Sequence, residues 1–230
     1  MTTTTATVKK PRAKKAKTTE PKTTHIIFLL DESGSMGVAA TDVRGGFNTY
    51  TESIKGDGNV YSLTVTKFGD NVRPLWKNLP LDEIPKLTEK DYLPFGSTGL
   101  YDAIGYALDQ AKELGTKKVP YGEEPIIFVI STDGYENASK KCTKEEITAR
   151  LKRRQDAKNW TIVYMGANVE SWQAESLGIA TGNILTHAGN SAGTNAAYGS
   201  LSRSTTASAG SGMGQTFRFF DPNDPSNKTP

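Results

Sequence analysis

Three oxygen-bearing side chains follow a short apolar run near the start of the chain. The run covers residues 26–30, and Asp31, Ser33 and Ser35 come after it at alternating positions. A short apolar run that ends in a polar turn containing glycine is typical of a strand buried on both faces. A tight turn can point these oxygens at one spot, and oxygen ligands suit Mg²⁺, with Mn²⁺ or Ca²⁺ as close substitutes. The opening strand therefore predicts one part of a divalent-cation site.

Two later segments add oxygen groups that can reach the same place. Thr98 stands in the small-residue loop 95–99 that opens a helix, and Asp133 follows the apolar run 125–130. In an open α/β sheet, ligands bind at the carboxyl ends of the strands. If the strands before Asp31 and Asp133 are neighbours, the loops meet at one edge. The predicted site then suits a divalent ion that keeps waters and leaves one coordination position open for an outside ligand.

The chain as a whole alternates between strand and helix patterns. Strands are predicted at 26–30, 61–66, 72–76, 125–130, 160–165 and 183–186. Helices are predicted at 38–55, 100–114, 143–159, 169–177 and 194–202. Gly45 and Gly46 in the first helix predict close packing against the sheet. This alternation implies an α/β fold with a doubly wound, mostly parallel sheet and helices on both faces, in three layers.

The two ends of the chain differ in composition from its middle. The net charge is +3, and residues 1–24 hold seven basic side chains against Glu20 alone. The remainder of the chain is therefore mildly acidic. We expect a disordered basic tail over 1–24, one domain over 25–204, and a flexible tail rich in Ser, Gly and Pro over 205–230.

Both tails contain residues that can contact a partner. The basic stretch 9–22 is the one segment predicted to reach nucleic acid, through charge alone, because no aromatic residues are interleaved with it. A solubilising role for this tail is the favoured interpretation. Phe217, Phe219 and Phe220 form an apolar island near the other end, and we expect them to pack onto the domain or to dock a partner.

The cysteine content and the hydropathy pattern bear on where the protein works. Cys142 is the only cysteine, which excludes an internal disulfide and fits a reducing compartment. No apolar run approaches the roughly 20 residues that span a bilayer, and the Thr-rich, basic beginning does not have the pattern of a secretory signal. We therefore expect a cytoplasmic protein without a membrane partner.

The candidate ligands resemble, in order and spacing, the metal-ion-dependent adhesion site of a von Willebrand factor A domain. The segments that carry the resemblance are Asp31-x-Ser33-x-Ser35, Gly96-Ser97-Thr98-Gly99-Leu100 and Thr132-Asp133-Gly134. A single such segment would be a weak motif, but three in order are specific. The resemblance covers roughly residues 24–200.

The resemblance implies a role for each candidate ligand. Ser33 and Ser35 would bind the ion directly, and Thr98, Asp31 and Asp133 would bind it directly or through water. An Asp or Glu of a protein partner would take the open position. Intracellular relatives act with ATPases or other multi-protein assemblies, so the resemblance implies a partner of that kind as well.

Two other classes of function compete with this interpretation. A Mg²⁺-dependent phosphohydrolase of the haloacid-dehalogenase type carries a second Asp two residues after the first, and here that position is Ser33, so the proton donor is missing. No P-loop occurs, and bland roles are expected for His25 and His187. We therefore predict that the protein is not an enzyme. The alternative that stays open is a structural scaffold protein, which could belong to a virion. In such a protein the metal would stabilise the fold.

Overall fold

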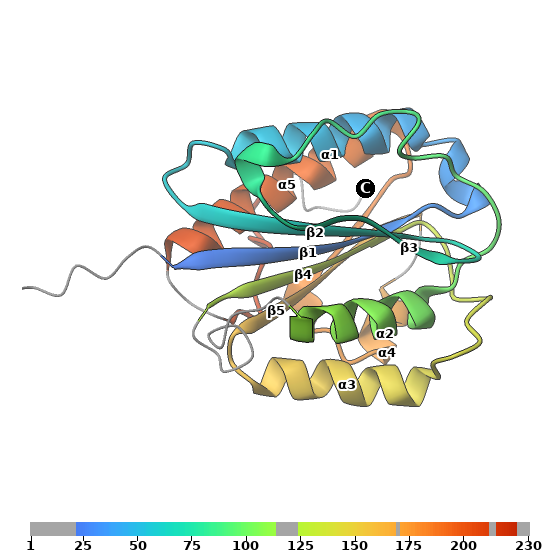
Figure 1. Cartoon of the computed structure of the whole chain (residues 1–230). Helices are drawn as coiled ribbons and strands as arrows, with labels where there is room; N and C mark the ends of the chain where they lie inside the picture. The colour runs from blue at the N-terminus through green and yellow to red at the C-terminus, as the bar shows by residue number, and fades with distance from the viewer. Residues whose placement is uncertain (1–21, 114–123, 169–170, 212–214, 225–230) are drawn as a thin grey trace, which may run out of the picture.

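The computed structural model describes residues 22–113, 124–168, 171–211 and 215–224 (Figure 1). One six-stranded sheet has the order β3-β2-β1-β4-β5-β6. Its strands are β1 (Thr23–Asp31), β2 (Val60–Phe68), β3 (Val72–Pro80), β4 (Ile126–Thr132), β5 (Trp160–Ala167) and β6 (Ile184–His187). All neighbouring strands are parallel except β2 and β3. The predicted mostly parallel sheet is therefore confirmed, and β1 and β4 are neighbours at its centre.

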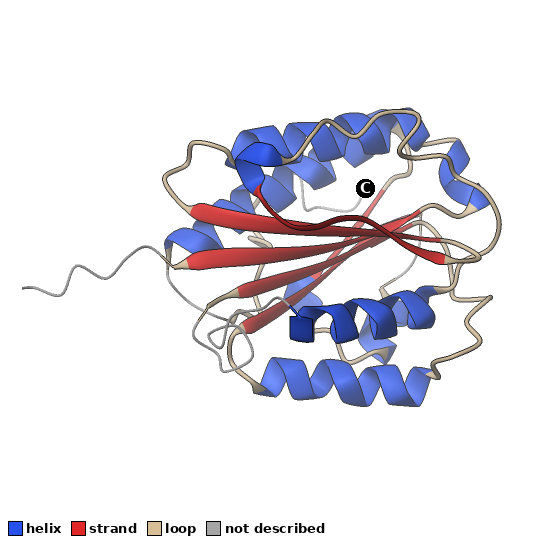
Figure 2. Cartoon of the chain, in the orientation of Figure 1, coloured by secondary structure: helices blue, strands red, loops and turns tan. Residues whose placement is uncertain are grey.

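Helices cover both faces of the sheet (Figure 2). They are α1 (Ala40–Ile54), α2 (Leu100–Gln110), α3 (Lys144–Asp156), α4 (Trp172–Ser176) and α5 (Ser191–Gly210). Helices α1 and α5 lie on one face, and α2, α3 and α4 lie on the other. Alternate residues of β1 point to opposite faces of the sheet: Phe28 packs against the α1 and α5 layer, and Leu29 packs against the layer on the other face. Strand β1 is therefore buried on both sides. The predicted three layers are confirmed.

The ends of several elements differ from the predicted ranges. A 3₁₀ turn at Gly34–Gly37 precedes α1, which begins at Ala40 rather than at residue 38. Helix α4 has only five residues. Helix α3 begins at Lys144, directly after Thr143, whose hydroxyl caps the helix by accepting the Glu146 N–H at 3.3 Å. None of the described helices is long and apolar enough to cross a bilayer.

The last helix is much longer than the sequence predicts. The prediction ended at residue 202 and placed a flexible tail from residue 205, but α5 continues to Gly210. Ser200, Ser204 and Thr205 on this helix are buried. These small side chains allow α5 to lie close against α1. Because serine and threonine are polar, a hydropathy pattern does not predict that they are buried. Helix α5 therefore runs across residue 204, where the sequence placed the end of the domain.

Gly46 of α1 lies directly against Tyr198 of α5. A Cβ atom at this position would lie 2.2 Å from Cδ2 of Tyr198, whose ring stacks on Phe28 with the centroids 6.4 Å apart. Gly45 has nothing within 4 Å of an added Cβ. The expected close packing therefore involves Gly46 alone, and its neighbour is α5 rather than the sheet.

The described part of the C-terminal segment packs onto the domain. Phe219 and Phe220 are buried, and the Phe220 N–H donates to the Gly182 carbonyl at 3.0 Å. The Asn183 side chain donates to the Thr216 carbonyl and accepts the Phe219 N–H. Packing of this apolar island onto the domain is confirmed for these two phenylalanines. The predicted basic tail, apart from residues 22–24, and residues 225–230 lie outside the described residues.

Strand β3 forms one edge of the sheet and is largely exposed. It pairs antiparallel with β2 after the turn 69–71 and extends beyond the predicted range to Pro80. Its register against β2 shifts near Val65, and it carries Pro74 and Pro80. Proline cannot donate to a ladder and is found mainly on edge strands, which fits this position.

Replacing each of the paired glycines in α1 tests the packing against α5. We expect Gly46→Ala to destabilise the domain by roughly 1–3 kcal/mol, because the added methyl group overpacks against the buried Tyr198 ring. We expect Gly45→Ala to stabilise it by about 0.5–1 kcal/mol, because the methyl group meets open space and alanine favours helix. Urea unfolding measures both changes, and equal effects of the two substitutions would contradict the packing described here.

Candidate metal centre

All the predicted ligands lie at the edge of the sheet formed by the carboxyl ends of the parallel strands (Figure 1). Asp31 ends β1, Ser33 and Ser35 lie in the turn that follows it, and Asp133 directly follows β4. Thr98 precedes α2 by two residues. The adjacency of β1 and β4, on which the prediction depended, places these segments side by side.

Asp31 organises the turn that carries the two serines. Its carboxylate is fully buried: Oδ1 accepts the Ser33 N–H at 2.7 Å, and Oδ2 accepts the Thr132 hydroxyl at 2.5 Å. The first bond closes the turn after β1, and the second ties β1 to the end of β4. The Tyr92 hydroxyl donates to the Asp31 carbonyl at 2.6 Å. Asp31 therefore fixes the backbone at the site besides offering an oxygen to it.

The two serine hydroxyls form a hydrogen-bonded chain that ends on Asp133. The Ser35 hydroxyl donates to Asp133 Oδ1 at 2.6 Å and lies 3.2 Å from the Ser33 hydroxyl. Because Ser35 has one proton and gives it to Asp133, Ser33 is the donor to Ser35. A Cβ atom built on Gly134 would lie 3.0 Å from Thr98 Oγ1 and 3.7 Å from Ser35 Oγ. A glycine at this position therefore leaves space between Thr98 and Ser35.

The site carries negative charge that the described residues do not neutralise. Burial raises the pKa of Asp31 to about 6, with a further contribution from the nearby charge of Asp133. Burial also raises the pKa of Asp133. Among the described residues neither carboxylate forms an ion pair, and no group of three or more His, Cys, Asp or Glu gathers to hold a metal. Two carboxylates with neutral hydroxyls fit a hard divalent cation that keeps waters.

Asn137 positions the threonine of the site, a role that the sequence analysis did not assign. Its side-chain oxygen accepts the Thr98 N–H at 2.9 Å, and its own N–H donates to the Thr98 carbonyl at 3.0 Å. The two residues stand 39 positions apart in the chain. No local pattern joins such a pair, so the sequence carries no signal for it.

Glu32 is a second residue whose role was missed. It is buried, and its carboxylate pairs with Lys67 at 3.0 Å and with Arg73 at 2.6 Å. The same carboxylate accepts the Leu93 N–H, and the Glu32 carbonyl accepts the Phe95 N–H. Glu32 therefore fastens the β2–β3 hairpin and the loop before Thr98 to the end of β1. The available signal was its position between Asp31 and Ser33. In an extended chain, its side chain is expected to point to the opposite side from theirs.

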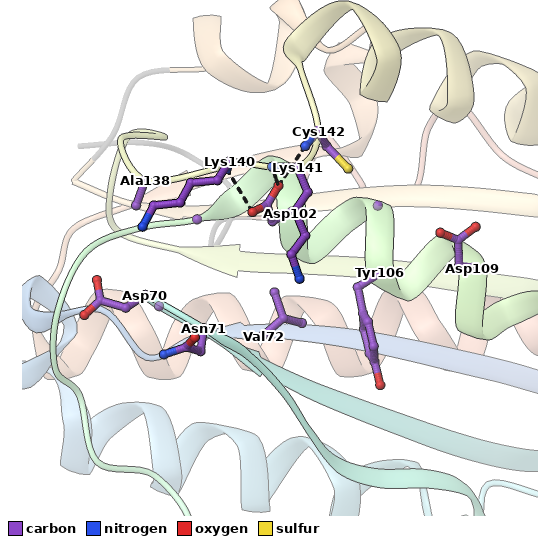
Figure 3. Close-up of a pocket in the computed structure, with 13 residues that line it drawn as sticks. Asp70, Asn71, Val72, Asp102, Tyr106, Asp109, Ala138, Lys140, Lys141 and Cys142 are labelled. Carbon is purple, nitrogen blue, oxygen red and sulfur yellow. Dashed lines mark hydrogen bonds between the residues drawn. The ribbon is translucent and has the colours of Figure 1, made fainter.

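A cavity of about 480 Å³ lies beside the metal centre, between the β2–β3 turn, the start of α2 and residues 138–142 (Figure 3). Burial by itself would raise the pKa of Asp102, but the backbone N–H groups of residues 140–142 donate to its carboxylate and lower the pKa. Asp70 accepts the Ser97 N–H, and Asp109 pairs with two basic side chains. Because each of these carboxylates is engaged within the chain, we do not assign a second cation site to this cavity.

The buried charge of Glu32 can be tested with a change that keeps its shape. We expect Glu32→Gln to destabilise the domain by about 3 kcal/mol or more, because Lys67 is then left buried without its counter-charge. The control is Arg73→Gln, which removes a partner that is mostly exposed and should cost less than about 1 kcal/mol. Urea unfolding compares the two, and a loss of similar size in both variants would refute the assigned role.

The fold and the candidate site together describe a class: a doubly wound α/β domain with clustered oxygen-bearing side chains at the loop edge. No protein-family model matches the sequence, and no curated protein matches it. Solved structures do resemble it. Proximal thread matrix protein 1 from the mussel byssus has a TM-score of 0.57 at 16% identity, over 77% of this chain and 46% of that chain. This chain thus spans less than half of that protein's length.

Two further structures support the same comparison. A von Willebrand factor type A structure from Catenulispora acidiphila has a TM-score of 0.53 at 16% identity, over 83% of this chain and 43% of that chain. The manganese-loaded TRAP protein of Plasmodium vivax has a TM-score of 0.54 at 20% identity, over 74% of this chain and 70% of that chain. The chain therefore has the fold of von Willebrand factor A domains, as its motifs predict.

Proposed function

We propose that this domain is a protein-interaction module that binds a carboxylate of a partner through a divalent cation. The cation would be Mg²⁺, with Mn²⁺ or Ca²⁺ as substitutes, and its ligands would be Asp31, Ser33, Ser35, Thr98 and Asp133. The observation that carries the proposal is the convergence of these side chains from three segments on one edge of the sheet. The cytoplasmic location and the partner in a multi-protein assembly belong to the same proposal.

The chemistry of the ligand set favours an acidic partner. Three of the five proposed ligands are neutral hydroxyls, which reduce the electrophilicity of a divalent ion less than carboxylates would, so an incoming Asp or Glu would bind well. Ser35 is exposed and Asp133 is partly exposed, whereas Asp31 and Ser33 are buried. The exposed side of the site is therefore the side from which a partner would approach.

Two of the similar structures are known with a metal. The TRAP structure is manganese-loaded, and a structure of the mussel protein has a zinc-occupied MIDAS motif. These ions belong to those proteins, and we carry over to this chain only the proposal that a divalent cation binds at the same edge.

Two observations support a role without catalysis. Ser33 stands where a phosphohydrolase would need its second acid. A G-x-S-x-G pattern does occur at residues 189–193, between β6 and α5, but Ser191 is not in the left-handed φ region and its hydroxyl donates to Asp42. A nucleophile elbow needs a strained turn and a hydroxyl activated by a base. We therefore interpret this pattern as a helix start.

Thermal unfolding in EDTA, Mg²⁺, Mn²⁺ and Ca²⁺ tests the metal site. We expect the divalent ions to raise the melting temperature, because a ligand at 100 times its Kd stabilises the folded state by about 2.7 kcal/mol. Asp133→Asn should abolish the rise, and it keeps an oxygen that can accept the Ser35 hydroxyl. Asp82→Asn, on an exposed 3₁₀ turn, is the matched control and should keep it. No rise with any ion at millimolar concentration would contradict a working site.

The scaffold alternative makes a different prediction for the same variants. If the ion only stabilises the fold, EDTA would lower the melting temperature but would leave partner binding unchanged below that temperature. If the domain is a metal-dependent interaction module, EDTA and Asp133→Asn would both abolish binding of an acidic peptide while the domain remains folded. Calorimetric titration with the peptide, checked by circular dichroism, separates the two.

A further inference from the structure

Large apolar side chains are unusually exposed around the metal centre. Seven such residues are exposed in the described part of the chain. Five lie on the loop edge that carries the metal ligands, and we call them the apolar rim: Val38 (95% exposed), Leu93 (59%), Phe95 (78%), Tyr135 (43%) and Trp172 (50%). The other two, Val60 (42%) and Phe217 (54%), lie at the start of β2 and in the C-terminal segment. Contiguous exposed apolar surface on a soluble domain marks an interaction site.

One side of the rim is fastened to the segment that binds the metal. The backbone N–H groups of Leu93 and Phe95 donate to the side chain and the carbonyl of Glu32, at 2.7 and 2.8 Å. The Gly34 N–H donates to the Gly96 carbonyl at 2.9 Å, which holds the loop against the serine turn. These apolar side chains are therefore presented on a loop with a fixed backbone.

The other side of the rim is equally anchored. Tyr135 follows Asp133 by two residues, and its ring stacks on Trp172 with the centroids 5.2 Å apart and the planes 19° apart. The Gln173 side chain donates to the Gly134 carbonyl at 3.2 Å, which holds the start of α4 beside the metal segment. Stacked rings of this kind lose little conformational entropy when a partner covers them.

The rim flanks the metal centre on both sides along the sheet. Glu32 is bonded to Phe68 at the end of β2, so the loop with Leu93 and Phe95 lies toward β2. Tyr135 follows β4, and Trp172 follows β5. Because strands lie about 4.8 Å apart, the distance from β2 to β5 is about 14 Å, or roughly four residues of extended chain. A segment of that length would place its central residue over β1 and β4, where the metal ligands are.

We propose that the apolar rim receives large apolar side chains that flank, on both sides, the metal-binding Asp or Glu of a protein partner. This inference rests on the proposed function and adds the chemistry of the partner segment. Apolar contacts around the carboxylate would exclude water from the metal bond and strengthen it, because electrostatic attraction grows as the local dielectric falls. Aromatic anchors surrounded by such contacts are the usual source of binding energy in interfaces.

A peptide selection tests the proposal directly. The probe is a phage-displayed library with one fixed Glu and about two random positions on each side, which in extended form spans the width of the rim. It is selected on the full chain in Mg²⁺ and eluted with EDTA. We expect large apolar residues to be enriched on both sides of the Glu.

Rim variants and type-matched controls then identify the surface that binds the selected peptide. We expect Val38→Ser and Phe95→Ser each to weaken binding by about tenfold or more. Val60→Ser and Phe217→Ser remove the same side chains from exposed positions outside the rim and should change it by less than about twofold. All four side chains are exposed, so we expect each variant to fold, and thermal unfolding checks this.

Several results would overturn the rim proposal while leaving the metal site intact. The first is that peptides eluted with EDTA lack apolar residues beside the Glu. The second is that the rim variants and the control variants bind the selected peptide equally well. The third is that calorimetry shows Mg²⁺ binding but the selection enriches no peptide. Two further results would overturn the rim proposal by assigning the rim to another occupant. One is binding to anionic phospholipid vesicles that is lost in Phe95→Ser. The other is self-association, measured by sedimentation velocity, that is lost in the same variant. Failure to bind Mg²⁺ at all would instead remove the proposed function.

Discussion

Two adjacent carboxylates, both buried at the end of the central strand, constrain the whole loop edge. Successive side chains of a strand point in opposite directions, so Asp31 faces the serine turn and β4, whereas Glu32 faces the β2–β3 hairpin. Burying a charge is costly unless it is paired. Glu32 is paired within the chain and forms a rigid joint. Asp31 has hydrogen bonds but no counter-charge among the described residues, and this difference separates a structural acid from a candidate metal ligand.

Two amide side chains hold the segments that carry Thr98 and Asp133. Asn137 clamps the backbone of Thr98, and Gln173 joins the Gly134 carbonyl to the hydroxyl of Tyr164 at 2.9 Å. The Gln173 side chain also accepts the Glu136 N–H. Neutral hydrogen-bonding groups position the site without adding charge to it. The backbone that carries the candidate ligands is therefore fixed by neutral groups.

The sequence predicted most of the architecture because its strongest signals are local. The apolar runs 26–30 and 125–130 are short and sharply bounded, and each is followed within three residues by an acid, so strand type, sheet edge and ligands could be predicted together. The roles of Glu32 and Asn137 depend on partners that lie 35 or more positions away, which no local pattern reveals. The length of α5 was missed for another reason: its buried serines and threonines pack through small size, which hydropathy interprets as exposure.

The two borders of the sheet have a consequence for how the molecule can assemble. A strand with free N–H and carbonyl groups on its outer side invites another chain to extend the sheet. Here one border strand, β3, carries Pro74 and Pro80 and a shifted register, and the other, β6, has only four residues. Both features are devices that discourage strand addition. Ribbon-like growth from copy to copy, and capture of an extended peptide as a seventh strand, are therefore disfavoured, and recognition is directed to side chains at the loop end.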